Sequence, residues 1–253
     1  MVANNPHELV IIVHAPDLVG DDARPLAIVR GMERAFPGLR LVWTTSDEGK
    51  RTLLADRDAW LAQQRRVGEF PLLHNGNESH YVSVSGWEAA TNISPGGQAQ
   101  LEVHAKLPLN AAGIAAAAAV LEGVAEGARA FWGRATPFNA AVEISRQTRD
   151  PVRKPGDPPR GLPALKFPDS LRAPEIPHCL GWLNYWSAAT AHAIGFPRLD
   201  CDAELLSWAK RTATGGWVVR LTEAPLDLDH PAHLKALLLA YERFPEIGGR
   251  SAP

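Results

Sequence analysis

Apolar and polar positions along the first third of the chain predict alternating strands and helices. Residues 8–14 (ELVIIVH) form a short β-branched run close to Pro16, which indicates a buried strand. Residues 23–36 repeat apolar side chains at helical spacing and stop at Pro37, so they predict a helix. Residues 39–45 (LRLVWTT) alternate again and predict a second strand.

The middle of the chain carries the clearest strand signals. Residues 56–66 predict a short amphipathic helix, and the Asn75-Gly76 pair predicts a hairpin turn. Residues 80–87 and 101–107 alternate with a period of two, the second of them (LEVHAKL) most regularly. These segments predict antiparallel strands with one face toward a core.

An alanine-rich stretch, residues 111–132, predicts the longest helix, with Asn110 as its N-cap. Gly123 and Gly127 lie four residues apart and would allow the helix to approach a sheet closely. Charged residues at Glu122 and Glu126 exclude a membrane-spanning segment. We therefore interpret this stretch as a core helix.

Residues 149–178 contain eight prolines, which forbid continuous helix or central strand. We expect a linker or a long surface loop within a single domain that spans residues 1–253. Beyond it, the spacing predicts helices around 204–211 and at about 231–244, and a strand at 217–222.

Hairpin signals outnumber clear strand–helix–strand crossovers along the chain. The predicted fold class is therefore α/β of the α+β type, with a mixed, largely antiparallel sheet flanked by helices.

Composition narrows the function classes. A net charge of −2 over 253 residues gives no basic footprint for nucleic acid. Two cysteines, Cys179 and Cys201, have neither the number nor the spacing of a disulfide framework or a zinc site. With no signal-peptide pattern and no membrane span, we expect a soluble cytoplasmic protein.

The stretch DLDHPAH, residues 227–233, is the densest cluster of candidate ligands. Asp227, Asp229, His230 and His233 are residue types that bind a divalent cation, and a metal-dependent hydrolase is one hypothesis. The same residues also suit a helix start, because Pro231 fits a first helical turn and Asp residues before it cap free amides. We favour the capping interpretation.

Other catalytic signatures are missing from the sequence. There is no G-x-S-x-G elbow, no Walker pattern and no G-x-G-x-x-G loop. His104 falls on the polar side of its strand beside Glu102 and Lys106, which is typical of a solvated sheet face. We expect no catalytic residue and no cofactor.

Three rings crowd residues 181–189 (GWLNYWSAA). If this segment is helical, Trp182, Tyr185 and Trp186 share one face. We expect Trp182 and Trp186 to be buried, whereas the Tyr185 hydroxyl tolerates a wet edge and could contact a partner.

Several longer segments resemble a known group of proteins. GMERAFPGLRLVW, SPGGQAQLEVHAKLPL, HCLGWLNYWSAA and GGWVVRLTEAPLDLDHPAHLKALLLAYERFPEIGGR are similar to a family of uncharacterised bacterial proteins over nearly the whole chain. More distantly, residues 70–106 and 181–244 resemble the immunity protein 52 family. That resemblance rests on an Asn-Gly turn before alternating strands, a G-W-x-x-Y motif and a W-V-V strand that leads to an amphipathic helix.

The second resemblance implies a protein that binds and neutralises a cognate toxin, often a nuclease delivered between bacteria by a secretion system. An acidic surface would suit a basic nuclease, because complementary charge steers association. The candidate partner contacts are Asp200, Asp202, Glu204, Asp227, Asp229 and Tyr185. A non-catalytic regulatory module without a toxin partner is a further alternative.

Overall fold

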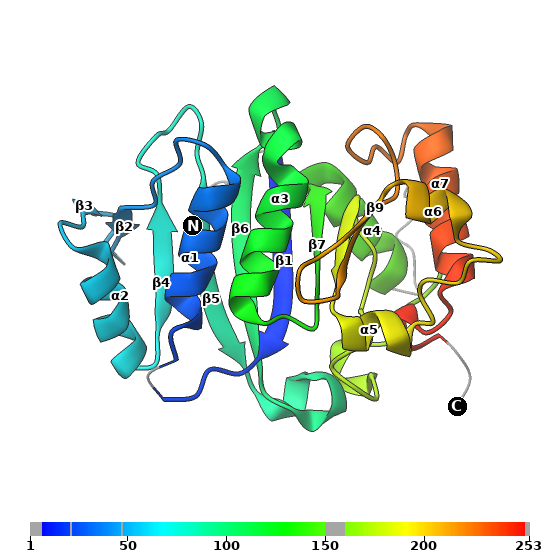
Figure 1. Cartoon of the computed structure of the whole chain (residues 1–253), viewed down its shortest axis with the longest axis horizontal. Helices are drawn as coiled ribbons and strands as arrows, with labels where there is room; N and C mark the ends of the chain where they lie inside the picture. Colours follow the sequence, from blue (N-terminus) through cyan, green and yellow to red (C-terminus); the bar gives the residue numbers. More distant parts are fainter. Residues whose placement is uncertain (1–6, 21, 47, 150–159, 251–253) are drawn as a thin grey trace.

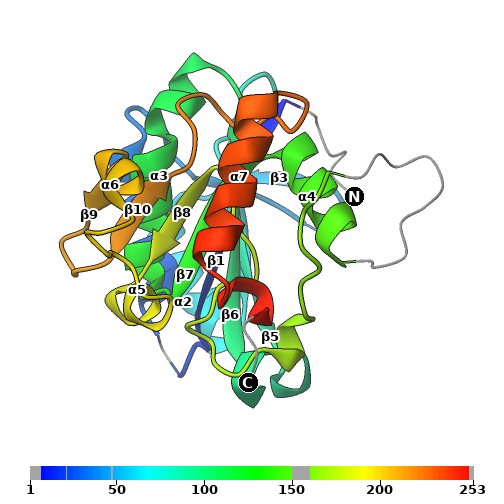
Figure 2. The same ribbon diagram turned by 90° about the vertical axis from the view of Figure 1, so that its right-hand side faces the viewer.

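Ten strands form one open antiparallel sheet, seen in Figure 1 and in side view in Figure 2. The computed structural model describes residues 7–20, 22–46, 48–149 and 160–250. The strand order is β3-β2-β4-β5-β6-β1-β7-β8-β10-β9. The strands are β1 (Glu8–Pro16), β2 (Trp43–Thr45), β3 (Arg51–Leu53), β4 (Phe70–His74), β5 (Ser83–Ala89), β6 (Gln100–Pro108), β7 (Trp132–Pro137), β8 (Leu183–Trp186), β9 (Ala209–Arg211) and β10 (Trp217–Arg220).

Helices cover both faces of the sheet, though unevenly. The α-helices are α1 (Arg24–Ala35), α2 (Arg57–Arg66), α3 (Ala111–Ala128), α4 (Phe138–Arg149), α5 (Ala188–Ala193), α6 (Ala203–Ser207) and α7 (Pro231–Arg243). Four 3₁₀ turns occur at Thr91–Ile93, Pro95–Gly97, Pro168–Ser170 and Ile247–Gly249. Helices α1, α2 and α3 lie on one face (Figure 1), and α4 lies on the opposite side of the sheet from α3 (Figure 2).

The main core lies between the central strands and helices α1 and α3. Alternate residues of β1 and β6 point toward these helices, and their Val13 and Val103 side chains are directly opposed and fully buried. The predicted alternation of residues 101–107 is confirmed, since Leu101, Val103 and Leu107 are all buried. Strand β1 lies between β6 and β7. Its apolar run suits this central position.

Helix α3 packs against α1 through glycines. A Cβ on Gly123 would lie 2.6 Å from the carbonyl oxygen of Gly31, and a Cβ on Gly127 would lie 2.7 Å from the amide nitrogen of Ile28. The close approach predicted from these glycines exists, but its target is a helix and not the sheet. Only backbone without side chains permits this separation.

The predicted N-cap of α3 is confirmed, because the Asn110 side chain accepts a hydrogen bond from the Gly113 amide at 2.9 Å. The helix ends at Ala128, where Arg129 adopts a left-handed conformation with φ of 54°, so the expected extension to Trp132 is wrong. Helix α3 is long and apolar enough to cross a membrane, but its Val120, Leu121 and Val124 side chains are fully buried. That burial is typical of a core helix.

The second face of the sheet is covered along only part of its width. Helix α4 contacts β1 and β7, and Phe244, directly after α7, packs against Trp186 of β8 at a ring-centroid distance of 5.1 Å. Toward β5 and β6 the same face carries polar or half-exposed side chains, among them His104 and Trp87, which is 48% exposed. We call the boundary between the covered part of this face, near β7 and β8, and the open part, near β5 and β6, the seam.

The predicted fold class is confirmed. The hairpin at Asn75-Gly76 is confirmed too, since β4 and β5 pair antiparallel with His74 opposite Ser83. The three rings at 181–189 do not share a helical face, because residues 183–186 form strand β8 between β7 and β10. Trp182 and Trp186 are nevertheless buried, as expected.

The other differences concern the extents of predicted elements and the elements that were not predicted. The strand expected at 39–45 spans only Trp43–Thr45, and the helix expected around 204–211 ends at Ser207, before strand β9. Strands β3, β7 and β9 and helices α4 and α5 were not predicted. Of the proline-rich segment, residues 160–178 run without continuous helix or strand, and residues 150–159 lie outside the described part of the chain.

Candidate functional site

Residues 225–229, which include Asp227 and Asp229 of the stretch 227–233, form one wall of an open cleft. Helix α4 and the irregular segment at Arg160 form the other walls, and the cleft holds about 460 Å³. Its lining residues are Leu109, Pro137, Asn139, Ala140, Glu143, Arg160, Pro225, Leu226, Asp227, Leu228 and Asp229. Three carboxylates against one guanidinium make the cleft acidic, and we call it the acidic cleft.

Arg160 ties the walls of the acidic cleft together. Its guanidinium donates to Asp229 at 2.7 Å, to Glu143 at 3.2 Å and to the Leu228 carbonyl oxygen at 2.7 Å. The hydrogen bond with Asp229 is the main cause that raises the pKa of Arg160. The Asp229 side chain is 82% exposed, so this ion pair contributes little to stability, and the carboxylate remains available to a partner.

The four candidate metal ligands do not converge on one point. Asp227 Oδ1 accepts a hydrogen bond from the Asp229 amide, and the Asp227 amide donates to His233 Nδ1 at 3.2 Å. The rings of His230 and His233 stack at 4.4 Å. Across the described residues, no group of three or more His, Cys, Asp or Glu side chains is arranged to hold a metal ion.

The capping interpretation of this stretch is correct only in part. Pro231 occupies the first turn of α7 as expected, but the N-cap is His230, and no side chain caps the helix. Asp227 instead closes a tight turn just before the helix, because its oxygen is held by the amide two residues on.

The second group of predicted acidic contacts, Asp200, Asp202 and Glu204, contains both exposed and buried side chains. Asp200 is exposed and pairs with Arg198 at 2.5 Å, and Glu204 is exposed in α6. Asp202 is completely buried and receives the guanidinium of Arg243 at 2.6 and 2.9 Å. Asp202 therefore holds α7 to the loop before α6 and does not face a partner.

The acidic residues do not form one surface. Arg243 ends α7 beside Asp202, whereas Asp227 and Asp229 precede the start of the same helix. A helix of 13 residues is roughly 20 Å long, so the two exposed groups lie at opposite ends of it. A partner must therefore be large to contact both groups.

Tyr185 is not a surface contact. Its side chain is 2% exposed, and its hydroxyl donates to Glu126 of α3 at 3.0 Å. Burial, followed by the charge of Glu126, raises the pKa of Tyr185. The expectation of a wet edge failed because the segment is a central strand, which places alternate rings on both faces of the sheet.

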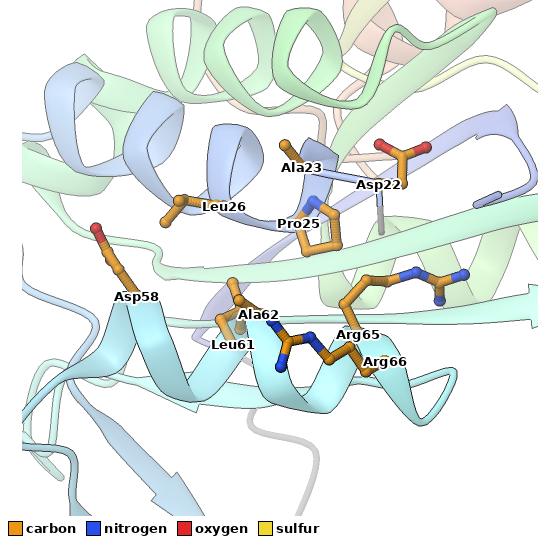
Figure 3. A pocket seen from close by; sticks show the side chains of 9 residues that line it. All are labelled: Asp22, Ala23, Pro25, Leu26, Asp58, Leu61, Ala62, Arg65 and Arg66. Carbon is orange, nitrogen blue, oxygen red and sulfur yellow. The ribbon is translucent and has the colours of Figure 1, made fainter. Parts of the chain in front are cut away.

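A smaller cavity of about 180 Å³ lies between α1 and α2 (Figure 3). Pro25, Leu26 and Leu61 give it an apolar floor. The charged groups at its rim are largely occupied, since Arg65 donates to the Gly20 and Leu18 carbonyl oxygens and Asp58 pairs with Arg30 and Arg57. It presents no evident nucleophile, acid or base to a ligand.

Among the described residues, several titratable groups with shifted pKa values lie close together at the seam. The sequence analysis did not predict this group. Strands β1, β6 and β7 present His14, Glu102 and Arg134 on the second face, and the segment that crosses this face contributes His178 and Cys179. We call these five residues the seam cluster. The alternation of residues 101–107 placed Glu102 and His104 on this face, but no local signal could place 178–179 beside them.

Hydrogen bonds and burial shift the acid–base behaviour of the cluster. Glu102 contacts His104 Nε2 at 2.5 Å and His14 Nδ1 at 3.8 Å. Burial lowers the pKa of His14 to about 4, and its ring stacks on Trp132 at 4.0 Å. At Glu102, burial acts to raise the pKa, but the hydrogen bond from His104 and the nearby His14 outweigh it, and the pKa falls.

At Cys179, burial likewise acts to raise the pKa of the thiol. The charge of Arg134 and a hydrogen bond with His178 oppose this effect, and the pKa is lowered overall. The pKa of His178 moves upward, because its hydrogen bond with Cys179 outweighs the effect of burial. The charge of Arg134 thus acts on every other member of the cluster.

Residues 20–252 match the family model described as a domain of unknown function, DUF5953. The chain belongs to this family. The match confirms the resemblance to an uncharacterised family over nearly the whole chain, whereas the resemblance to the immunity protein 52 family stays a prediction. A search of the curated proteins found no match to this DUF5953 chain.

Among solved structures, a Pseudomonas aeruginosa T6SS protein, PA0821, has a similar fold. The TM-score is 0.54 and the sequence identity is 12%, and the match covers 94% of the DUF5953 chain and 72% of the other chain. At this identity the likeness concerns the fold alone.

Proposed function

We propose that this protein acts in the cytoplasm of a bacterium as an immunity protein, which binds and neutralises a cognate toxin of a type VI secretion system. The observation that carries the proposal is a fold shared with a T6SS protein along 94% of the chain. The distant sequence resemblance to a family of toxin inhibitors supports the same role. The protein would act by binding and not by catalysis.

The acidic cleft is the contact surface that we favour. It offers Asp227 and Asp229 at its exposed rim, and its concave shape suits a protruding basic side chain of a nuclease. Exposed carboxylates also speed the encounter with a basic partner, because long-range attraction acts before contact. Asp200 and Glu204, at the far end of α7, form the second candidate surface.

Co-expression with the product of each neighbouring gene tests the role itself. If one neighbour is toxic alone, and this protein restores growth and co-purifies with it, the proposal stands. If no neighbour is toxic or none binds, the proposal fails.

Charge reversal then tests the surface. Asp227→Lys/Asp229→Lys should slow association with the toxin by about tenfold to a hundredfold at low salt, and less at high salt. Asp200→Lys/Glu204→Lys is the matched control, since it reverses two exposed carboxylates at the other end of the same helix. A stronger effect of the control variant would move the contact surface to α6.

A further inference from the structure

Arg134 is a cation without a carboxylate partner at the centre of the sheet. It lies on β7 between Ile12 of β1 and Asn184 of β8. Among the described residues, none forms an ion pair with Arg134, and its buried Nε has no hydrogen-bond partner. Leaving a guanidinium half-buried and unpaired is costly, so such a group calls for an explanation.

The neighbours of Arg134 do not neutralise it. The nearby carboxylate, Glu102, is held by His104 at 2.5 Å and lies 3.8 Å from His14. Arg134 acts to lower the pKa of His14, Glu102 and Cys179, so its charge lies near all three groups. The guanidinium of Arg134 therefore keeps a donor without an acceptor at the edge of the open sheet face.

Two further donors on the same face of β7 are also without partners. Trp132 is 2% exposed and Thr136 is completely buried, yet the Trp132 Nε1 and Thr136 Oγ1 atoms make no hydrogen bond in the described structure. They flank Arg134 at two-residue spacing, so all three side chains project to one face. Gly181 lies directly over this row, since a Cβ there would be 2.3 Å from Thr136 Oγ1.

We propose that the seam cluster is a binding site for an oxyanion, a phosphate or a carboxylate, held by Arg134 between the sheet and the segment at His178. The guanidinium supplies planar paired donors that match such oxygens. His14 and His178 both lie within reach of the charge of Arg134 and can take up a proton when the anion arrives. Arg134, His14 and His178 are each partly exposed, which gives access from solvent.

Titration of the wild-type protein with inorganic phosphate, sulfate and acetate tests this site without any variant. Binding next to His14 should raise the pKa of His14 above about 4, by on the order of one unit, and this shift is visible in NMR spectra of the histidine rings. Chloride at equal ionic strength is the control. Unchanged histidine titration with all three anions would exclude a site for free anions.

Variants then assign the site to Arg134. Arg134→Gln should weaken phosphate binding at least about tenfold, and Arg134→Lys should retain part of it, because the charge survives without the paired geometry. Arg211→Gln, which removes an exposed cation from β9 of the same sheet, should leave binding unchanged. Equal loss in both glutamine variants would reveal only a general charge effect and would overturn the proposal.

The two sources of the oxyanion give different results. A free phosphate or metabolite shifts the histidines of the isolated protein. A carboxylate of a protein partner instead leaves the isolated protein unchanged, and Arg134→Gln then weakens the complex with the toxin. If neither effect occurs, the site does not bind oxyanions, whatever the outcome of the growth-rescue experiment.

Discussion

Breaking the buried pair of Asp202 and Arg243 should destabilise the protein strongly. Asp202 is completely buried and receives two hydrogen bonds from Arg243, which also donates to the Gly195 carbonyl oxygen at 2.8 Å. Arg243→Leu leaves the carboxylate buried without its counter-charge. Removing one partner of such a pair costs roughly 3–5 kcal/mol. We expect about 3 kcal/mol, because Arg243 is partly exposed and the Arg198 amide still donates to Asp202.

Urea denaturation measures this change as a lower midpoint at unchanged slope. Asp202→Asn/Arg243→Leu should recover much of the loss, since the neutral amide needs no counter-charge. Arg198→Leu is the matched control: its pair with Asp200 lies in the same loop but is 59% and 65% exposed, and no measurable change is expected. A loss in Arg243→Leu no larger than in this control would refute a structural role for Asp202.

Three further perturbations test the helices and the seam. Gly123→Ala should lower the free energy of unfolding by about 1–3 kcal/mol, because overlap with the Gly31 carbonyl outweighs the better helix propensity of alanine. A variant that is more stable in urea would contradict the α1–α3 contact. Asn110→Ala should cost about 1 kcal/mol by removing the cap on α3, and unchanged thermal unfolding would contradict it. Burial holds the pKa of His14 at about 4, below its ordinary 6.5, so the contribution of His14 to stability is constant above pH 6.5 and is lost as the pH drops toward 4. This loss of stability reaches about 3 kcal/mol in the wild-type protein and should be absent in His14→Phe. If the urea midpoints of wild type and His14→Phe depend equally on pH, the prediction is wrong.

Local patterns predicted the elements whose signals are complete within one segment. The alternation of residues 101–107, the Asn75-Gly76 turn and the Asn110 cap each depend on neighbouring residues, and each was found. Residues 181–189 show the limit of such patterns. Rings at positions 182, 185 and 186 fit a helical face, but pairing with β7 and β10 on both sides makes the segment a strand.

The sequence by itself determined the antiparallel α/β class, the core helix α3 and the exposed carboxylates before α7. Tertiary structure decided which carboxylates face solvent, because the burial of Asp202 depends on Arg243, 41 residues away in the chain. It also assembled the seam cluster from β1, β6, β7 and the segment at His178, none of which carries a motif alone. Charges and burial act through space, so a site built from distant strands becomes visible only once the sheet order is known.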